Sequence, residues 1–167
     1  MPTSVMVVVS NTSPLSNLAI IDRLDILRGK FGLITLPQAV RHELDRLSHP
    51  AARARLAVAI RDGWLQVTPL CHPAPSGLAA SLDLGEMEAL ALALQLKASL
   101  ILLDESAARL KASQFGLPHA GILGILRWAK QSGQITSLAA EIRRLRSEAR
   151  FFISPALEKR MLASVGE

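Results

Sequence analysis

The chain has one cysteine and no tyrosine, and aromatic residues make up only 4% of it. A single cysteine, Cys71, excludes an intrachain disulfide and any zinc site built from several cysteines. Low cysteine content is typical of proteins of the reducing cytoplasm, where we expect this chain to act. The scarcity of aromatic rings argues against a base-stacking platform, so a bound nucleic acid would be held mainly through its backbone.

Other features that define protein classes are also missing. No apolar run approaches the roughly 20 residues that a membrane-spanning helix needs, so no membrane partner is predicted. The sequence has no glycine-rich phosphate loop and no Gly-x-Ser-x-Gly motif. The four histidines are scattered without metal-ligand spacing. Side-chain carboxylates and amides therefore remain as the groups to examine.

The composition is that of a globular protein with a basic balance. Hydrophobic residues make up 50% of the 167 residues, which argues against disorder and is enough for a core. We predict a single domain over residues 1–167, with the C-terminal helices of residues 136–167 as an appendage. The net charge of +5 permits a polyanionic partner without requiring one.

Short apolar runs alternate with helical patterns along the chain. Strands are predicted at residues 5–9, 33–36, 65–70, 99–103 and 117–120, the third of them at an edge. Helices are predicted at residues 38–47, 51–62, 86–97, 106–115, 121–131 and 138–150, with a last one from Pro155. A further helix follows the first strand, with Ser13 as its cap and Pro14 at its first position. Residues 69–82 read as a surface loop that could cover a site. This order predicts a three-layer α/β/α domain with a mostly parallel sheet of four to five strands.

Residues 83–105 hold a helix and a strand with acids at key positions. Asp83 and Glu86 have capping-box spacing, and Glu86 also borders the apolar line of the helix. The apolar run that follows stops at Asp104 and Glu105. Ligands of open parallel sheets bind beyond the carboxyl ends of the strands, which is where Asp104 is expected.

Four side chains from four elements are candidates for one site: Asn11, Glu43, Glu86 and Asp104. Converging carboxylates without a basic partner repel one another, and a hard cation such as Mg²⁺ or Mn²⁺ relieves this through oxygen ligands. Such a site can activate water and hold a phosphodiester. Each residue also has a purely structural interpretation that the pattern leaves open. Asp104 could cap the next helix, Glu86 could act only in the capping box, Glu43 could pair with Arg46, and Asn11 could be a turn residue.

Four segments together resemble the PIN domain, and are most similar to its VapC-like branch. They are VVVSNTSPLSNLAIIDRLDIL, ITLPQAVRHEL, LGEMEALALALQLKASLILLDE and FFISPALEKRML. The resemblance implies a PIN-like fold and a metal-dependent endoribonuclease, the toxin component of a toxin–antitoxin pair. By matching position it implies Asn11, Glu43, Glu86 and Asp104 as catalytic residues and ligands of Mg²⁺ or Mn²⁺. It also implies that Ser13 supports them, that RNA is the substrate, and that an antitoxin and a homodimer are expected.

Asn11 departs from the resembled pattern, which has Asp there. An amide keeps one oxygen ligand but loses a unit of negative charge, so metal affinity is expected to fall. The alternative hypothesis is therefore a weakened or inactive PIN-like module that binds RNA or protein.

Overall fold

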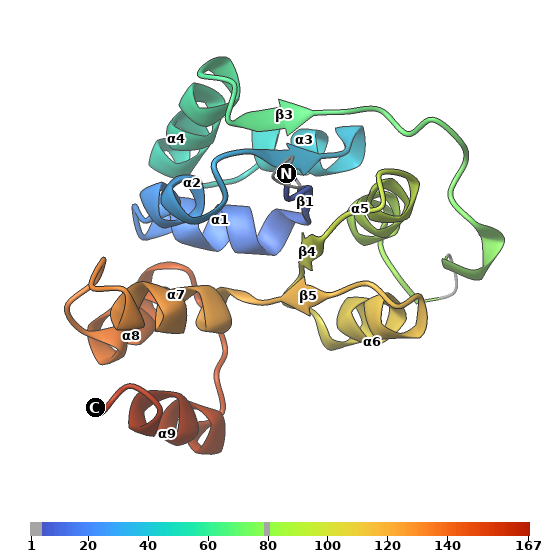
Figure 1. The fold of residues 1–167 in the computed structure, drawn as a ribbon. Coiled ribbons are helices and arrows are strands. Elements are labelled where there is room, and N and C mark those ends of the chain that lie inside the picture. Colours follow the sequence, from blue (N-terminus) through green and yellow to red (C-terminus); the bar gives the residue numbers. More distant parts are fainter. Residues whose placement is uncertain (1–4, 79–80) are drawn as a thin grey trace.

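The computed structural model describes residues 5–78 and 81–167, and within them five short strands form one sheet (Figure 1). The strands are β1 (Val8–Ser10), β2 (Ile34–Leu36), β3 (Leu65–Val67), β4 (Leu100–Leu102) and β5 (His119–Ala120). Their order is β3-β2-β1-β4-β5, and each described pair is parallel. The predicted α/β class and mostly parallel sheet are confirmed, and β3 is an edge strand as expected.

Helices cover both faces of this sheet. They are α1 (Thr12–Ile20), α2 (Leu24–Phe31), α3 (Gln38–Asp45), α4 (Pro50–Arg61), α5 (Leu84–Gln95), α6 (Ser106–Gln114), α7 (Ile122–Gln131), α8 (Leu138–Glu148) and α9 (Pro155–Ala163), with a short 3₁₀ helix η1 (Ser76–Leu78). Figure 1 shows α1, α2 and α7 on one side of the sheet and α5 and α6 on the other. Contacts then place α4 against α1, α3 against α5 and α8 against α7.

The internal positions of β1 and β4 in the sheet explain why their sequences are continuously apolar. Val8, Val9, Ile101 and Leu102 are each at most 1% exposed, because helices cover both sides of β1 and β4. The outer part of the predicted first strand behaves differently. Val5 is 80% exposed, and the strand begins only at Val8. The run of β-branched residues therefore predicted the strand but placed its start too early.

The helix after β1 also begins earlier than predicted. Asn11 is the N-cap residue of α1, so Ser13 lies inside the first turn and is not the cap. Helix α2 was not predicted. Asp22, with a positive φ of 57°, lies in the short turn that separates α2 from α1. In the predicted loop 69–82, η1 is the only helix among the described residues, and residues 79 and 80 lie outside them.

The parallel register brings the carboxyl ends of the central strands to one edge. Ser10 pairs with Leu102, and the backbone N–H of Asn11 donates to the carbonyl of Leu102 at 3.1 Å. Asp104 follows β4 by two residues, and Gly121 follows β5 directly. The residues that come immediately after β1, β4 and β5 are therefore neighbours at this edge.

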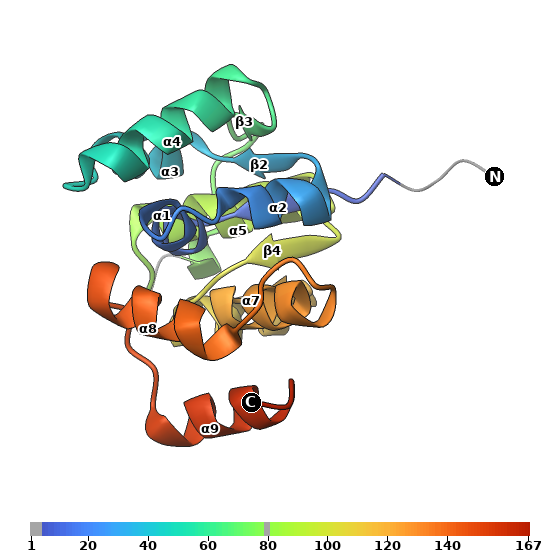
Figure 2. The same ribbon diagram turned by 90° about the vertical axis from the view of Figure 1, so that its left-hand side faces the viewer.

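The C-terminal part of the chain packs in two different ways. Leu138, Ile142 and Leu145 bury one side of α8, whereas α9 has no fully buried residue. Figures 1 and 2 both show α9 beyond α7 and α8, at the end of an extended segment. Partly buried side chains of α9, among them Leu157 and Met161, still pack against the core. The description of residues 136–167 as an appendage remains a prediction.

Candidate functional site

Asn11 directly follows β1, and its side chain does not cap the helix that comes next. It is the N-cap residue of α1 but makes no side-chain capping hydrogen bond. The residue is 3% exposed, and its Oδ1 is buried without a hydrogen-bond partner among the described residues. A turn residue normally uses this oxygen to accept from the backbone, so its side chain does not behave as a simple turn residue.

Asp104, at the end of β4, has one oxygen bound and one unpaired. Its Oδ1 accepts from the backbone N–H of Ile122 at 2.8 Å, which caps α7 rather than α6. Its Oδ2 is buried without a hydrogen-bond partner in the described chain. The pKa of Asp104 is raised to about 6, chiefly by burial and to a smaller extent by the charge of Glu105. The hydrogen bond from Ile122 and the charge of Arg109 oppose this rise.

Two glycines allow the backbone to approach these acids closely. A Cβ at Gly121 would lie 2.9 Å from Oδ1 of Asp104, a distance that real Cβ atoms essentially never show. A Cβ at Gly85 would overlap the carboxylate of Glu43, at 2.8 Å from its Oε2. The first turn of α5 therefore lies directly against Glu43.

Glu43 on α3 and Glu86 on α5 belong to two helices that pack against each other. Glu86 is 7% exposed and forms the predicted capping box, in which Asp83 N donates to its Oε2 at 3.1 Å. Burial raises the pKa of Glu86; the hydrogen bond from Asp83 opposes this, and the charges of Asp83, Glu105 and Glu43 raise it further. Glu43 is half-buried and accepts a hydrogen bond from the hydroxyl of Thr12, rather than pairing with Arg46.

Glu105 lies between the surroundings of Asp104 and those of Glu86, and it was not among the residues predicted from the sequence. The hydroxyl of Ser13 donates to Oε1 of Glu105 at 2.7 Å. The charge of Glu105 acts on both Asp104 and Glu86, as the pKa shifts of those two acids indicate. The first turn of α1 therefore binds one carboxylate through Thr12 and a second through Ser13. The sequence signal was present, since the β4 run ends in two consecutive acids.

The predicted residues are thus neighbours at one edge of the sheet, but not equally close. Within residues 5–78 and 81–167, no three acidic, histidine or cysteine side chains form a group able to hold a metal ion. Glu86 is influenced by Glu43 and Glu105, whereas Asp104 is influenced by Glu105 and Arg109. Glu88, two residues from Glu86, instead accepts from the backbone N–H of Ala39 at 2.9 Å and so caps α3.

A family model described as PIN domain (DUF3368) matches residues 7–167. The chain belongs to this PIN-domain family. PIN domains are typically nucleases, and the match extends from the residue before β1 to the last residue. A search of curated proteins finds no match.

A solved PIN-domain structure shows the same fold at low sequence identity. The PIN domain endonuclease Utp24 is 18% identical, covers 68% of this chain and 83% of its own, and has a TM-score of 0.50. A PilT N-terminus domain protein from the hyperthermophilic archaeon Sulfolobus solfataricus P2 is also 18% identical. That match covers 72% of this PIN domain and 90% of the archaeal chain, with a TM-score of 0.49. In the described part of the chain, no helix combines the length and apolarity that crossing a bilayer requires.

By chemical type, the oxygen donors at this edge of the PIN domain suit a hard divalent cation. Buried polar atoms are nearly always paired, so the unpaired oxygens of Asn11 and Asp104 indicate a missing partner. Both atoms are oxygens at neighbouring strand ends, and Glu105, whose charge acts on both Asp104 and Glu86, adds a carboxylate at the same edge. Oxygen donors of this kind suit Mg²⁺ or Mn²⁺ and not a metal that prefers sulfur or nitrogen.

Proposed function

We propose that this PIN domain is a metal-dependent endoribonuclease that hydrolyses phosphodiester bonds in RNA. The observation that carries the proposal is the pair of unpartnered buried oxygens, Asn11 Oδ1 and Asp104 Oδ2, at neighbouring strand ends. In the reaction, a water oxygen bonds to phosphorus while the bond to the leaving ribose oxygen breaks. The proton lost by the water is balanced by one gained by the leaving oxygen.

Each residue has a distinct task in this proposal. Asp104 and Glu86 hold the cation, with Asn11 as a neutral ligand, and Glu43 orients water or a second ion. Bound there, Mg²⁺ or Mn²⁺ supplies positive charge that offsets the carboxylates and stabilises the charge that develops on the phosphate. Thr12 fixes the carboxylate of Glu43, and Ser13 fixes that of Glu105. Glu105 supplies part of the negative charge that Asn11 lacks.

A second candidate function follows from Asn11 itself. Without the charge of an aspartate at this position, the site binds a cation more weakly, and the chain could then act as a module that binds RNA or protein. The two candidates differ in one property, since only the nuclease requires a cation for its effect on RNA.

The biological setting extends the same proposal. A VapC-like toxin would act in the cytoplasm, would be blocked by an antitoxin protein and would form a homodimer. These three expectations rest on the sequence resemblance. A small neighbouring reading frame that encodes a DNA-binding protein would support the antitoxin. The mass of the protein in solution tests the dimer.

Calorimetric titration of Mn²⁺ into the purified chain tests the nuclease proposal. We expect one saturable binding event that Asp104→Asn abolishes, together with cleavage of single-stranded RNA that requires Mn²⁺ and is lost in the same variant. Cleavage that persists in Asp104→Asn would overturn the assignment of this site. Specific RNA binding without any cleavage at saturating Mn²⁺ would favour the binding module.

A further inference from the structure

A groove of about 700 Å³ includes Asp104 and Glu105 in its lining and extends over residues that the proposed site does not use. One side is formed by α6, β5 and α7, and the other by the segment between α8 and α9 and by α9 itself. Asp104 and Glu105 line this groove, and so do Phe151 and Phe152 from the segment between α8 and α9. The groove therefore joins the proposed reaction site to a surface that the four predicted site residues do not include.

Beyond the two acids, the charged side chains that line this groove are basic. They are Arg109 and Arg127, and neither has an acidic side chain within ion-pair distance in the described chain. Arg109 is placed close to the acids, since its Nη1 is 3.6 Å from where a Cβ at Gly121 would lie. Arginines without acidic partners are available for phosphate oxygens, which they bind in a planar, forked geometry.

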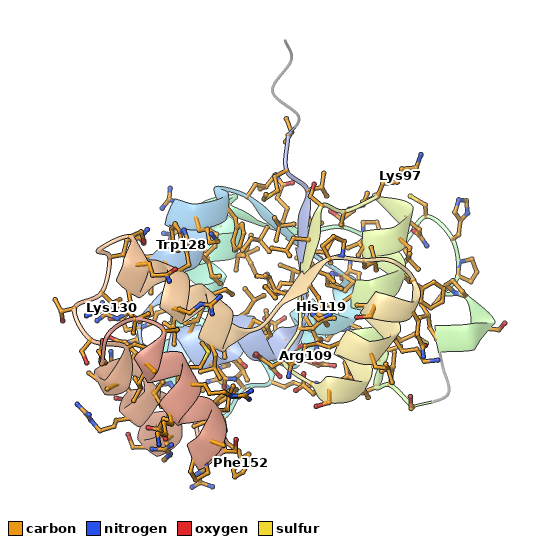
Figure 3. All side chains as sticks on the ribbon, turned by 60° about the horizontal axis from the view of Figure 1, so that its bottom comes forward. Lys97, Arg109, His119, Trp128, Lys130 and Phe152 are labelled. Carbon is orange, nitrogen blue, oxygen red and sulfur yellow. The ribbon has the colours of Figure 1, made fainter. Side chains whose placement is uncertain are left out.

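The groove also presents an aromatic ring to solvent. Phe152 is 85% exposed, the highest exposure among the large hydrophobic side chains of the described residues. Phe151, next to it, is half-buried and packs against the core. Figure 3 shows Arg109 beside α6 and Phe152 beside α9. One exposed ring is enough to stack a single base, although it does not form an extended platform.

The outer wall of the groove is held in place by polar contacts. Arg146 of α8 forms an ion pair with Glu158 of α9 at 2.5 Å. The side chain of Glu167 accepts from the backbone N–H groups of Leu138 and Ala139, at 2.7 and 3.0 Å. Helix α9 is therefore attached to α8 near both of its ends, so the wall has a defined position opposite α6 and α7.

We propose that this groove binds a single-stranded segment of the polynucleotide next to the cleaved bond. Arg109 and Arg127 contact consecutive phosphates and Phe152 stacks on one base. The proposal rests on the proposed function for its reacting end, since the strand would enter the acids at Asp104. Its occupant is a polynucleotide because the groove combines cations for phosphates with a ring for a base. An acidic peptide would use the arginines but would gain little from an exposed phenylalanine.

Equilibrium binding of a short fluorescein-labelled single-stranded RNA, measured by anisotropy in EDTA, tests this groove without cleavage. We expect Phe152→Ala to weaken binding roughly ten-fold, because a stacked base contributes on this scale, and Phe152→Trp to restore it. Phe152→Ala should leave the salt dependence of binding unchanged. Arg127→Ala should weaken binding and lower the slope of log K against log salt by about 0.7, the value for one phosphate contact on a single strand.

Arg143→Ala is the matched control, because Arg143 is exposed on α8 and does not line the groove. This substitution should leave the affinity for the RNA and its salt dependence unchanged. A DNA strand of the same sequence shows whether the groove distinguishes the two polynucleotides, and binding of either supports the assignment. A polyglutamate peptide that binds as tightly, with Phe152→Ala affecting neither ligand, would replace the polynucleotide with a peptide and overturn the proposal.

Failure of the groove and failure of the nuclease are distinguishable. If Mn²⁺-dependent cleavage occurs while the Phe152 and Arg127 variants bind RNA like the unmodified chain, the groove assignment is wrong and the nuclease stands. If RNA binding in EDTA depends on both residues while no cleavage occurs with Mn²⁺, the groove stands and the nuclease is wrong.

Discussion

Asn11 and Asp104 follow the carboxyl ends of two hydrogen-bonded neighbouring strands, and each has one buried side-chain oxygen without a partner in the described chain. Leaving a buried acceptor unpaired costs about 1–3 kcal/mol, so two of them at one place reduce the stability of the fold. Sites that carry such a penalty are commonly those where a ligand supplies the missing contact. The pair is therefore better explained by binding than by folding.

Asn11→Asp is expected to strengthen cation binding. A carboxylate restores the unit of charge that the amide lacks, and charge is a main determinant of affinity for hard cations. We expect the affinity for Mn²⁺ to rise on the order of ten-fold by calorimetry, and the metal-free protein to lose stability because a second buried carboxylate is added beside Asp104. Asn17→Asp, on α1 away from the strand end, is the matched control and should not change Mn²⁺ affinity. Unchanged binding in Asn11→Asp would remove Asn11 from the ligand set.

Asp104 should make the metal-free protein less stable as the pH rises from about 4 to about 6. Its pKa is raised to about 6 in the folded chain, so the folded state retains a proton that the unfolded state releases near its ordinary value of 3.8. The favourable contribution of the protonated group is complete below pH 4 and is lost as the pH passes 6. Asp104→Asn stays neutral and keeps the oxygen that accepts from Ile122. It should therefore be more stable than the unmodified chain at pH 7 by about 2–3 kcal/mol, and equally stable at pH 4.

Chemical denaturation of the metal-free protein at several pH values checks this expectation. Asp25→Asn, on the exposed surface of α2, is the control for removing one carboxylate. A stability difference between Asp104→Asn and the unmodified chain that is the same at pH 4 and pH 7 would contradict the buried, unpaired environment of Asp104.

Sequence reasoning found the strand ends but not the contacts between them. The apolar runs placed Asn11 and Asp104 correctly at carboxyl ends, because this follows from parallel topology alone. The hydrogen bond between Ser13 and Glu105 joins residues that are 92 positions apart, and no local pattern encodes it. For the same reason Ser13 read as a helix cap, when its hydroxyl in fact binds an acid.

Local ambiguity accounts for the other differences. The sequence pattern around Glu86 fits both a capping box and a site. The structure shows the cap, which one oxygen completes, and burial raises the pKa of Glu86, with smaller contributions from the neighbouring acids. Glu88 was separated from the site by its place on the helix. The hydrogen bond that it accepts from Ala39 could not be predicted without knowing that the first turn of α3 lies beside α5. The groove is also absent from any pattern, because α6, α7 and α9 become adjacent only in the fold.

Gly85→Ala tests how closely α5 must approach Glu43. The added methyl group would overlap the carboxylate of Glu43 and move it away from Thr12. Alanine favours a helix over glycine by about 1 kcal/mol, so stability should change little or rise while Mn²⁺ affinity falls. Gly29→Ala is the matched control, because a Cβ there would meet only Oε1 of Gln134 at an ordinary 3.7 Å. It should stabilise α2 without altering Mn²⁺ binding, and equal Mn²⁺ affinities in both variants would show that Glu43 is not needed for binding.

Glu167 is expected to hold α9 through the amino end of α8. Its carboxylate accepts from Leu138 and Ala139 and forms an ion pair with Lys130 at 3.1 Å. The two backbone hydrogen bonds lower the pKa of Glu167 to about 2, so its stabilising contribution is complete above the ordinary pKa near 4.5 and is lost as the pH falls toward 2. Glu167→Ala should lower stability at pH 7 by about 1 kcal/mol, as removal of a helix cap does, and the difference should shrink below pH 4.

Hydrogen exchange in α9 should accelerate in Glu167→Ala, and RNA affinity should fall because the outer wall of the groove is released. Glu148→Ala, which removes only the exposed pair with Arg144, is the control. If hydrogen exchange in α9 were as slow in Glu167→Ala as in Glu148→Ala, the contacts of Glu167 with α8 would not be what positions this wall.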